Sequence, residues 1–408
     1  MSTRIHATGT PPHASIMSPK FHGFLQLQPI ILSFLFLFLI STPSFNITCA
    51  PTHTDLDTWI SWHLQNYKNK SLQYSNTKPE SVTQRASSTG VDWRLRMAEM
   101  NRIEISVSQD GAADFKTITE AIHTIPLYNN RRVLIRINSG VYREKVNIPR
   151  TMRFITFVGN ASDPPTITGN DTASTVSGRD GTPLRTFQSA TVAVDADYFM
   201  AINIKFENTA PHVVGTVGGQ AVALRISGTK AAFYNCSFYG SQDTLYDHKG
   251  LHYFSNCFIQ GSVDFIFGYG TSLYENCYLK SVSKKVASVT AQKRSNSSIS
   301  SGFSFKNCTV TGSGSIYLGR AWGDYSRVIF SYTFMDKIVL PQGWSDWGKQ
   351  SRDQKVFYGE YKCSGPGANL TGRVPWARAL TDQEAMPFIG TYYVDGDTWL
   401  IDPSLYQL

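Results

Sequence analysis

The sequence predicts an all-β fold in which short parallel strands stack as the coils of a solenoid. The main observation is an Asn-Cys pair that recurs four times, with an aromatic residue two positions before each Asn: Asn235-Cys236, Asn256-Cys257, Asn276-Cys277 and Asn307-Cys308. The successive spacings are 21, 20 and 31 residues. A repeat length in the twenties, with Gly, Ser and Asn in the turns, is typical of stacked coils. Neighbouring coils bring parallel strands to about 4.7–4.9 Å, so residues one repeat apart become neighbours.

Short apolar segments support this fold over most of the chain. They alternate with Gly, Asn and Ser turns from residue 154 to about residue 333, and strands are expected at 133–137, 154–158, 190–194, 201–206 and 221–226. No second long helical pattern interrupts them, which excludes a doubly wound α/β fold. The four repeated cysteines are expected to face inward as a ladder first, and to be disulfide candidates only second.

Helices are expected at the two ends of the solenoid. A short capping helix is predicted over 114–125, with Asp114 as its N-cap and with apolar residues at helical spacing: Phe115, Ile118, Ile122 and Ile125. Such a helix would plug the open N-terminal end. Near the C-terminus, Thr381 and Glu384 match a capping box, and Pro387 would end the helix that follows. We expect the remaining tail to lie back along the solenoid.

The N-terminal region indicates secretion. Residues 30–40 are an apolar run that is too short to cross a bilayer and that suits a signal peptide. We assign residues 1–45 to a signal peptide with cleavage between 41 and 50, residues 46–98 to an extension or linker, and residues 99–408 to the catalytic domain. Glycosylation sequons agree with secretion, although those at Asn235 and Asn307 are expected to be too buried for use.

Charge and composition do not identify the binding partner. The net charge is +8 and only 17% of the residues are charged, which suits a secreted β-rich protein. A positive balance fits an acidic polymer as partner, but a generic basic surface would look the same. No zinc-type spacing of Cys or His is present.

Two aspartates and two glutamines share the repeat. Asp243 and Asp264 lie 21 residues apart in apolar surroundings, and Gln220 and Gln242 lie 22 apart. Stacked coils would therefore place them in one column. The alternative is that the aspartates merely bond to turn backbones, which is less consistent with four polar residues in register.

Such a column is suited to acyl transfer. Two carboxylates one coil apart cannot both ionise easily, so one is expected to act as nucleophile or base and the other as acid. Arg320 could hold one carboxylate in two-pronged geometry, and Trp322 could stack on a sugar ring. The glutamine amides could stabilise an oxyanion. This set fits an aspartate nucleophile better than a metal site.

Five segments resemble the five motifs of the pectinesterases (pectin methylesterases), in the order and at about the spacing of that family. They are GVYRE at 140–144, QAVAL at 220–224, QDTL at 242–245, DFIFG at 264–268 and LGRAW at 318–322. Segments 186–191 and 358–361 are similar to further family segments, so the resemblance covers residue 103 to the C-terminus. It implies a right-handed parallel β-helix that hydrolyses the methyl esters of galacturonate units in pectin, without a metal or other cofactor.

The resemblance also implies a role for each site residue. Asp264 would be the nucleophile, Asp243 the acid and then the base, and Gln242 the stabiliser of the oxyanion with Gln220 beside it. Arg320 would keep Asp264 ionised. Trp322 and Thr186 would contact the substrate, and Tyr246 and Phe267 would line the groove.

The resemblance implies a monomer secreted to the cell wall, with pectin as partner and neither nucleic acid nor, after cleavage, a membrane. It leaves a protein inhibitor open as a further partner. Two features depart from many plant members: Ala321 stands where they have Pro, which could loosen that turn, and the inhibitor-like N-terminal domain is missing.

Two other functions fit parts of the pattern. A retaining glycosidase also uses two close carboxylates, and a β-helix that only binds pectin needs no catalysis. Methanol release without loss of polymer viscosity would separate the three.

Overall fold

The computed structural model describes residue 65 and residues 90–178, 180–211 and 217–406. The chain divides into two compact units, residues 1–49 and 50–408, and every described residue belongs to the second. The expected signal peptide and most of the expected extension therefore lie outside the described residues. The assignment of domains stays a prediction.

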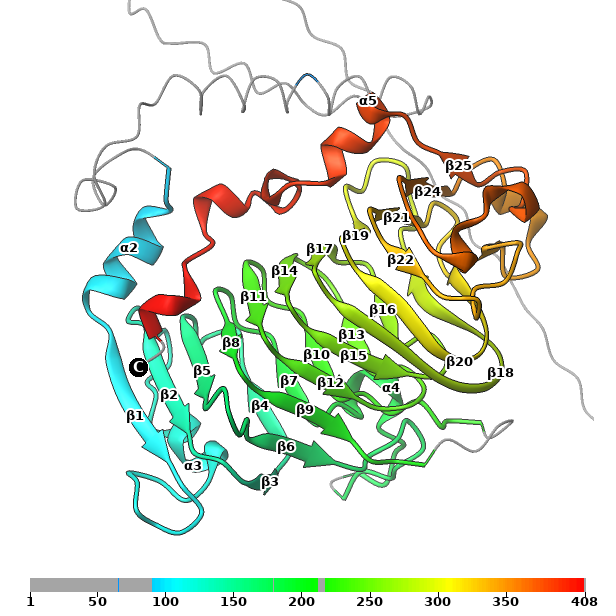
Figure 1. Cartoon of the computed structure of the whole chain (residues 1–408). Helices are drawn as coiled ribbons and strands as arrows, with labels where there is room; N and C mark the ends of the chain where they lie inside the picture. The colour runs from blue at the N-terminus through cyan, green and yellow to red at the C-terminus, as the bar shows by residue number, and fades with distance from the viewer. Residues whose placement is uncertain (1–64, 66–89, 179, 212–216, 407–408) are drawn as a thin grey trace, which may run out of the picture. The chain divides into compact units, whose positions relative to one another are not determined.

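The described part is a parallel β-helix (Figure 1). One sheet of eleven parallel strands runs along it. Its strands, in spatial order, are β1 (Ile103–Val107), β2 (Val133–Ile137), β5 (Ile155–Gly159), β8 (Met200–Ile202), β11 (Ala231–Tyr234), β14 (Leu251–Ser255), β17 (Thr271–Glu275), β19 (Gly302–Lys306), β21 (Arg327–Ser331), β24 (Phe357–Tyr361) and β25 (Arg378–Ala379).

Two further rows of parallel strands complete each coil. The long strands β18 (Tyr278–Gln292) and β20 (Thr309–Arg320) pass from one row into the other. The β3 row holds β3 (Val141–Arg143), β6 (Thr166–Gly169), β9 (Lys205–Asn208), β12 (Ser237–Tyr239), β15 (Phe258–Gly261) and β22 (Phe334–Met335). The β4 row holds β4 (Val146–Ile148), β7 (Val192–Val194), β10 (Leu224–Ile226), β13 (Leu245–Asp247), β16 (Ile266–Gly268) and β23 (Trp344–Ser345).

The interior of the coils carries the repeat that the sequence shows. The aromatic residues before each Asn stack face to face and continue to Phe330, with ring centroids 4.7, 4.5, 4.6 and 4.5 Å apart along Phe233, Phe254, Tyr274, Phe305 and Phe330. The four repeated cysteines are buried beside this ladder and unbridged. The prediction of inward-facing cysteines is therefore confirmed for the described residues.

The asparagine of each pair makes the turn between two rows. Asn235, Asn256, Asn276 and Asn307 all have a left-handed backbone, with φ between 52° and 56°. Asparagine adopts this conformation more readily than most residues, which explains its recurrence. The turn points these side chains outward, so Asn235 and Asn307 are exposed. The expectation that their sequons are too buried is wrong.

The N-terminal capping helix is shorter than predicted. Helix α3 spans Ile118–His123, and its N-cap is Thr117, which forms a capping box with Glu120. Asp114 is not the N-cap, because its carboxylate accepts hydrogen bonds from the backbone N–H and the hydroxyl of Ser106 instead. Glu144 accepts from the backbone N–H groups of the first helical turn and so ties α3 to the first coil.

Helices and turns also cover the outer face of the eleven-stranded sheet. The capping box at Thr381 is confirmed: it begins α5 (Asp382–Ala385), and Pro387 lies in the 3-10 turn Met386–Phe388 that follows. The tail then runs along the sheet (Figure 1), where Trp399 is buried in one cluster with Leu95 of α2 (Trp93–Met100). Sequence analysis did not predict α2, since this helix buries only Leu95 and Ala98. One further turn of helix, α4 (Arg185–Gln188), interrupts the strands.

Candidate active site

The two aspartates lie in the turns that lead into neighbouring strands of the β4 row. Asp243 precedes β13 and Asp264 precedes β16, and the backbone N–H of Asp243 donates to the carbonyl of Val263 at 3.0 Å. Both are buried, with 8% and 5% exposed. The acids therefore lie on adjacent coils, as the 21-residue spacing predicts.

Both aspartates also have a left-handed backbone. Their φ angles are 65° and 49°, in a region that few residues other than Gly, Asn and Asp adopt. Such backbone conformations persist where the surrounding structure fixes them and are frequent at active sites. Here the turns fix the direction in which each carboxyl group leaves the backbone.

Arg320 and Ser288 bind the Asp264 carboxylate. The Arg320 Nε donates to Oδ1 at 2.7 Å and to Oδ2 at 3.0 Å, and its terminal nitrogen also donates to Oδ2. The Ser288 hydroxyl donates to Oδ1. Every one of these contacts is a donor to oxygen, which suits a carboxylate anion. The predicted pairing of Arg320 with Asp264 is present in the structure.

Asp243 has the opposite environment. No described side chain donates a hydrogen bond to its carboxyl group, whose pKa is raised well above the ordinary value of 3.8. Burial is the main cause, followed by the negative charge of Asp264, while Arg320 lowers the pKa by a smaller amount. Asp243 therefore keeps its proton at pH values where an exposed aspartate has lost it.

The glutamines lie beside this pair. The N–H of Ala221 donates to the carbonyl of Gln242 at 3.1 Å, which sets Gln220 and Gln242 on neighbouring coils. Both side chains are partly exposed. Neither amide makes a side-chain hydrogen bond to another described residue, so both can donate to a bound group.

Aromatic rings form the floor next to the column. Tyr246 and Phe267 are register partners on β13 and β16, and their rings stack at 4.2 Å. The Trp322 ring lies 6.1 Å from that of Phe267. Thr186 is partly buried in α4, and its neighbour Phe187 meets Tyr246 edge-on at 6.2 Å. The structure thus brings the predicted substrate-contacting residues into one surface.

Sequence reasoning missed three residues here. Ser288 follows Asp264 by 24 residues, close enough to the repeat length to have been included in the column. Trp347 places its ring 3.7 Å from the Arg320 guanidinium, and Arg352 donates to the carbonyls of Ala321 and Trp322. Neither of these two had a signal in the repeat, because both follow β23, Trp347 in a turn and Arg352 in the short 3-10 helix Gln350–Arg352.

The sequence suggests that Ala321 could loosen its turn, but the structure shows an additional contact there. Its side chain is fully buried, and its N–H donates to the carbonyl of Ser345 at 2.9 Å. A proline has no N–H and could not make this bond. The alanine therefore adds a link between β20 and β23 at this turn.

The site contains carboxyl, guanidinium, amide and aromatic groups. Among the described residues, no group of three or more His, Cys, Asp or Glu could hold a metal ion. A protonated acid beside a charge-compensated carboxylate, with free amide donors close by, can transfer an acyl group to the carboxylate and protonate the leaving group.

Comparisons with known proteins agree with this site. The sequence profile of the family described as Pectinesterase matches residues 104–397. Pectinesterase QRT1 of Arabidopsis thaliana is 47% identical over 298 residues, which are 72% of this chain and 78% of that protein. Pectinesterase 31 of the same plant is 42% identical over 297 residues, 71% of this chain and 92% of that protein.

Solved structures agree as well. The pectin methylesterase from carrot matches with a TM-score of 0.66 and 34% identity, over 72% of this chain and 94% of that one. The enzyme from Aspergillus niger matches with a TM-score of 0.62 and 29% identity, over 74% and 96%. The prediction of a right-handed parallel β-helix is confirmed. The chain belongs to the pectinesterase family, the carboxylic ester hydrolases that remove methyl esters from pectin.

Proposed function

We propose that this protein hydrolyses the methyl esters of galacturonate units in pectin with Asp264 as the nucleophile. A carboxylate oxygen of Asp264 attacks the ester carbonyl carbon, and the carbonyl π electrons move to its oxygen. The Gln242 amide, with Gln220 beside it, donates to this oxyanion. Arg320 and Ser288 hold Asp264 in place for the attack.

Asp243 supplies the proton. As the tetrahedral intermediate collapses, the bond to the methoxy oxygen breaks and Asp243 protonates that oxygen, so methanol leaves and an acyl-aspartate anhydride remains. Asp243, now a carboxylate, then takes a proton from water while the water oxygen attacks the galacturonyl carbon. Asp264 leaves as a carboxylate, and Asp243 is protonated again.

The observation that carries this assignment is the different surroundings of the two acids. Asp264 accepts three donor groups, whereas Asp243 is buried without a described donor and has a raised pKa. Two carboxyl groups whose environments separate their protonation states are suited to opposite roles in acid–base catalysis. Reversing the roles would require the acid to be the one that is paired with Arg320.

The aromatic surface supports an extended polysaccharide as substrate. Tyr246, Phe267 and Trp322 lie side by side next to the acids, and Thr186 adds a hydroxyl group at the edge. A solved pectin methylesterase that is 28% identical to this chain is in complex with a hexasaccharide. We infer that pectin lies across the same surface here.

We also infer that the protein is a secreted monomer that acts in the cell wall. The apolar run at 30–40 and the exposed sequon asparagines Asn160, Asn170, Asn296 and Asn369 support secretion. In the described part of the chain, no helix has the length and apolarity needed to cross a membrane. A protein inhibitor as partner stays a prediction, which binding of a purified inhibitor would test.

The test is methanol release from highly methylated pectin, with polymer viscosity followed in the same sample. We expect methanol without loss of viscosity in the wild type, and no methanol from Asp264→Asn. Asparagine keeps the shape and tolerates the left-handed backbone, so the variant should fold. Loss of viscosity would indicate a glycosidase, and full turnover by a folded Asp264→Asn would exclude Asp264 as the nucleophile.

A further inference from the structure

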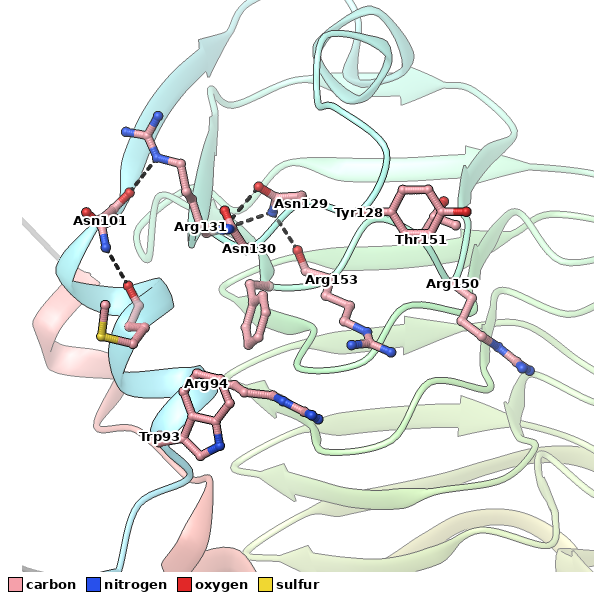
Figure 2. A pocket seen from close by; sticks show the side chains of 12 residues that line it. Trp93, Arg94, Asn101, Tyr128, Asn129, Asn130, Arg131, Arg150, Thr151 and Arg153 are labelled. Carbon is pink, nitrogen blue, oxygen red and sulfur yellow. Dashed lines mark hydrogen bonds between the residues drawn. The ribbon is translucent and has the colours of Figure 1, made fainter.

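A large cleft lies at the N-terminal end of the solenoid, away from the aspartates. It is lined by α2, by the turn at 128–131 before β2 and by the turn at 150–154 between β4 and β5 (Figure 2). Its volume is about 890 Å³, which is in the range of sites for organic ligands. Arg150 follows β4, whereas Asp264 precedes β16, four strands further along the β4 row. This separates the cleft from the acids by about 19 Å along the solenoid.

The cleft is strongly basic. Four of its twelve lining residues are arginines and none is acidic. Arg94 and Arg150 are exposed and form no ion pair with a described residue. The contact between Arg153 and Asp197 is long, at 3.5 Å, and the Arg153 side chain is 44% exposed. In Figure 2 the guanidinium groups of these three arginines lie along one side of the cleft, while Arg131 turns away and donates to the carbonyl of Asn101.

Apart from Asp197, two acids on or beside α2 are already bound to cations that do not line the cleft. Asp92 pairs with Lys230 at 2.8 Å. Glu99 pairs with Arg132 at 2.7 Å. These carboxylates therefore do not compensate the cleft arginines. The positive charge is available to an anion from outside.

Two exposed aromatic rings stand at the same cleft. Trp93 is 62% exposed and Tyr128 is 81% exposed. Tyr128 also has a left-handed backbone with φ of 62°, held by a hydrogen bond from its N–H to the carbonyl of Thr151 at 2.8 Å. Its ring is not packed against the core, so the left-handed backbone does not serve to bury this side chain. An apolar ring face beside a cation suits a sugar ring that carries a carboxylate.

We propose that this cleft is a second binding site for acidic pectin, which takes de-esterified galacturonate stretches and lies outside the catalytic groove. Arginine matches a carboxylate with two parallel hydrogen bonds, and the row of three arginines matches a chain of carboxylates better than a single ion. The proposal rests on the function proposed above, since de-esterified galacturonate is the product of that reaction. A protein held by its own product stays near the neighbouring esters, so demethylation would proceed in runs along one polymer.

The test compares two double variants of equal charge. Arg94→Gln/Arg150→Gln removes two charges from the cleft. Lys116→Gln/Lys280→Gln is the matched control, because both lysines are exposed, form no ion pair with a described residue and do not line the cleft. The probe is an unesterified galacturonate oligomer, with a neutral galactose oligomer of the same length beside it. Calorimetry gives affinity and stoichiometry, and amide hydrogen exchange locates the bound oligomer.

We expect the acidic oligomer to occupy two sites on the wild type and to slow exchange at 93–101 and 128–131, and the neutral oligomer to leave these segments unchanged. The cleft variant should bind about tenfold more weakly at this site, because exposed ion pairs are individually weak but two are lost. The control variant should bind like the wild type. On long pectin, the cleft variant should leave shorter runs of free galacturonate, with unchanged methanol release from a short methylated oligomer.

Equal affinity in the cleft variant, or slowed exchange only around 243–248, would overturn the proposal. Exchange at 93–101 and 128–131 that stays unchanged when the acidic oligomer is added would also overturn the proposal. Neither the affinity nor the exchange measurement needs turnover. Failure of the Asp264→Asn test would therefore contradict the catalytic proposal and leave this one standing.

Discussion

Replacing Asp243 with Asn tests the division of roles between the two acids most directly. The side chain keeps its size, and asparagine tolerates the φ of 65° at this position, so the fold should be unchanged. The amide cannot protonate the methoxy group. General acid–base catalysis contributes about 10²–10⁴-fold, and we expect kcat for methanol release to fall by that factor.

The raised pKa of Asp243 adds a pH signature. The wild type should be active while Asp243 keeps its proton and should lose activity as the pH rises through that pKa. Asp243→Asn should lack this alkaline limb. The leaving group gives a second check: a galacturonate trifluoroethyl ester releases a more acidic alcohol that needs less help from a proton donor, so the variant should be impaired less on it than on the methyl ester.

The same substitution should stabilise the protein above pH 4. A raised pKa means that the folded state binds the Asp243 proton more tightly than the unfolded state does. The free energy of unfolding is therefore highest below the pKa that Asp243 has in the unfolded state. It falls as the pH rises toward the pKa in the folded state, by about 1.4 kcal/mol for each tenfold difference in proton affinity between the two states. Asp243→Asn removes this loss, so urea unfolding at pH 7 should occur at higher urea concentration. Near wild-type kcat, or a change in pectin affinity alone, would refute the assignment of Asp243 as the acid.

Three further substitutions separate catalysis from structure. Ser288→Ala removes one donor to the Asp264 carboxylate, worth about 1.5–3 kcal/mol, so kcat should fall about 10- to 100-fold; a change in KM alone would contradict a role in holding the nucleophile. Arg320→Lys keeps the charge but not the two-pronged geometry, so kcat should be reduced and should fall further in Arg320→Ala, whereas equal rises in KM on partly de-esterified pectin would show that Arg320 only binds substrate. Tyr274→Phe removes the hydrogen bond to the buried Asp247 and should lower the free energy of unfolding by about 1–3 kcal/mol with unchanged kcat; a large loss of kcat would show that the buried pair supports the site.

The repeat makes the fold and the aspartate column predictable. Parallel stacking converts a spacing of about 21 residues into direct contact, so Asp243 and Asp264 can be placed on adjacent coils from sequence alone. The aromatic and Asn positions are predictable for the same reason, because each has one place in every coil. Arg320 requires more, since its pairing with Asp264 spans 56 positions and follows from charge and from the family motif rather than from the spacing.

Features outside the repeat cannot be predicted in this way. Helix α2 buries only Leu95 and Ala98, too few apolar residues to produce a helical pattern. The predicted N-cap of α3 is wrong because Asp114 and Thr117 are both good caps, and only the tertiary contact of Asp114 with Ser106 decides between them. The contact of Trp347 with Arg320 depends on a turn with φ of 60° that no periodicity specifies.

Ala321 links a feature that the sequence motifs predict, Arg320, with one that they do not, Trp347. It lies in a family motif, yet its N–H donates to Ser345, and the Ser345 hydroxyl accepts from the N–H of Trp347 at 3.2 Å. Trp347 in turn covers Arg320. The alanine is thus the first link in a short chain of contacts that ends at Arg320, the partner of Asp264.

Ala321→Pro should therefore destabilise this protein. The lost hydrogen bond leaves a carbonyl without its partner, at a cost of about 1–3 kcal/mol. Proline also restricts the unfolded chain, which stabilises the folded state by only about 0.4–1 kcal/mol. Because the lost hydrogen bond outweighs this gain, the free energy of unfolding should fall, and kcat should drop severalfold as Trp347 moves from Arg320. Ala321→Ser keeps the N–H and is the control. If the proline variant unfolds at a higher temperature than both the wild type and the serine variant, with undiminished kcat, the bond to Ser345 does not hold this turn, and Trp347 stays on Arg320 for another reason.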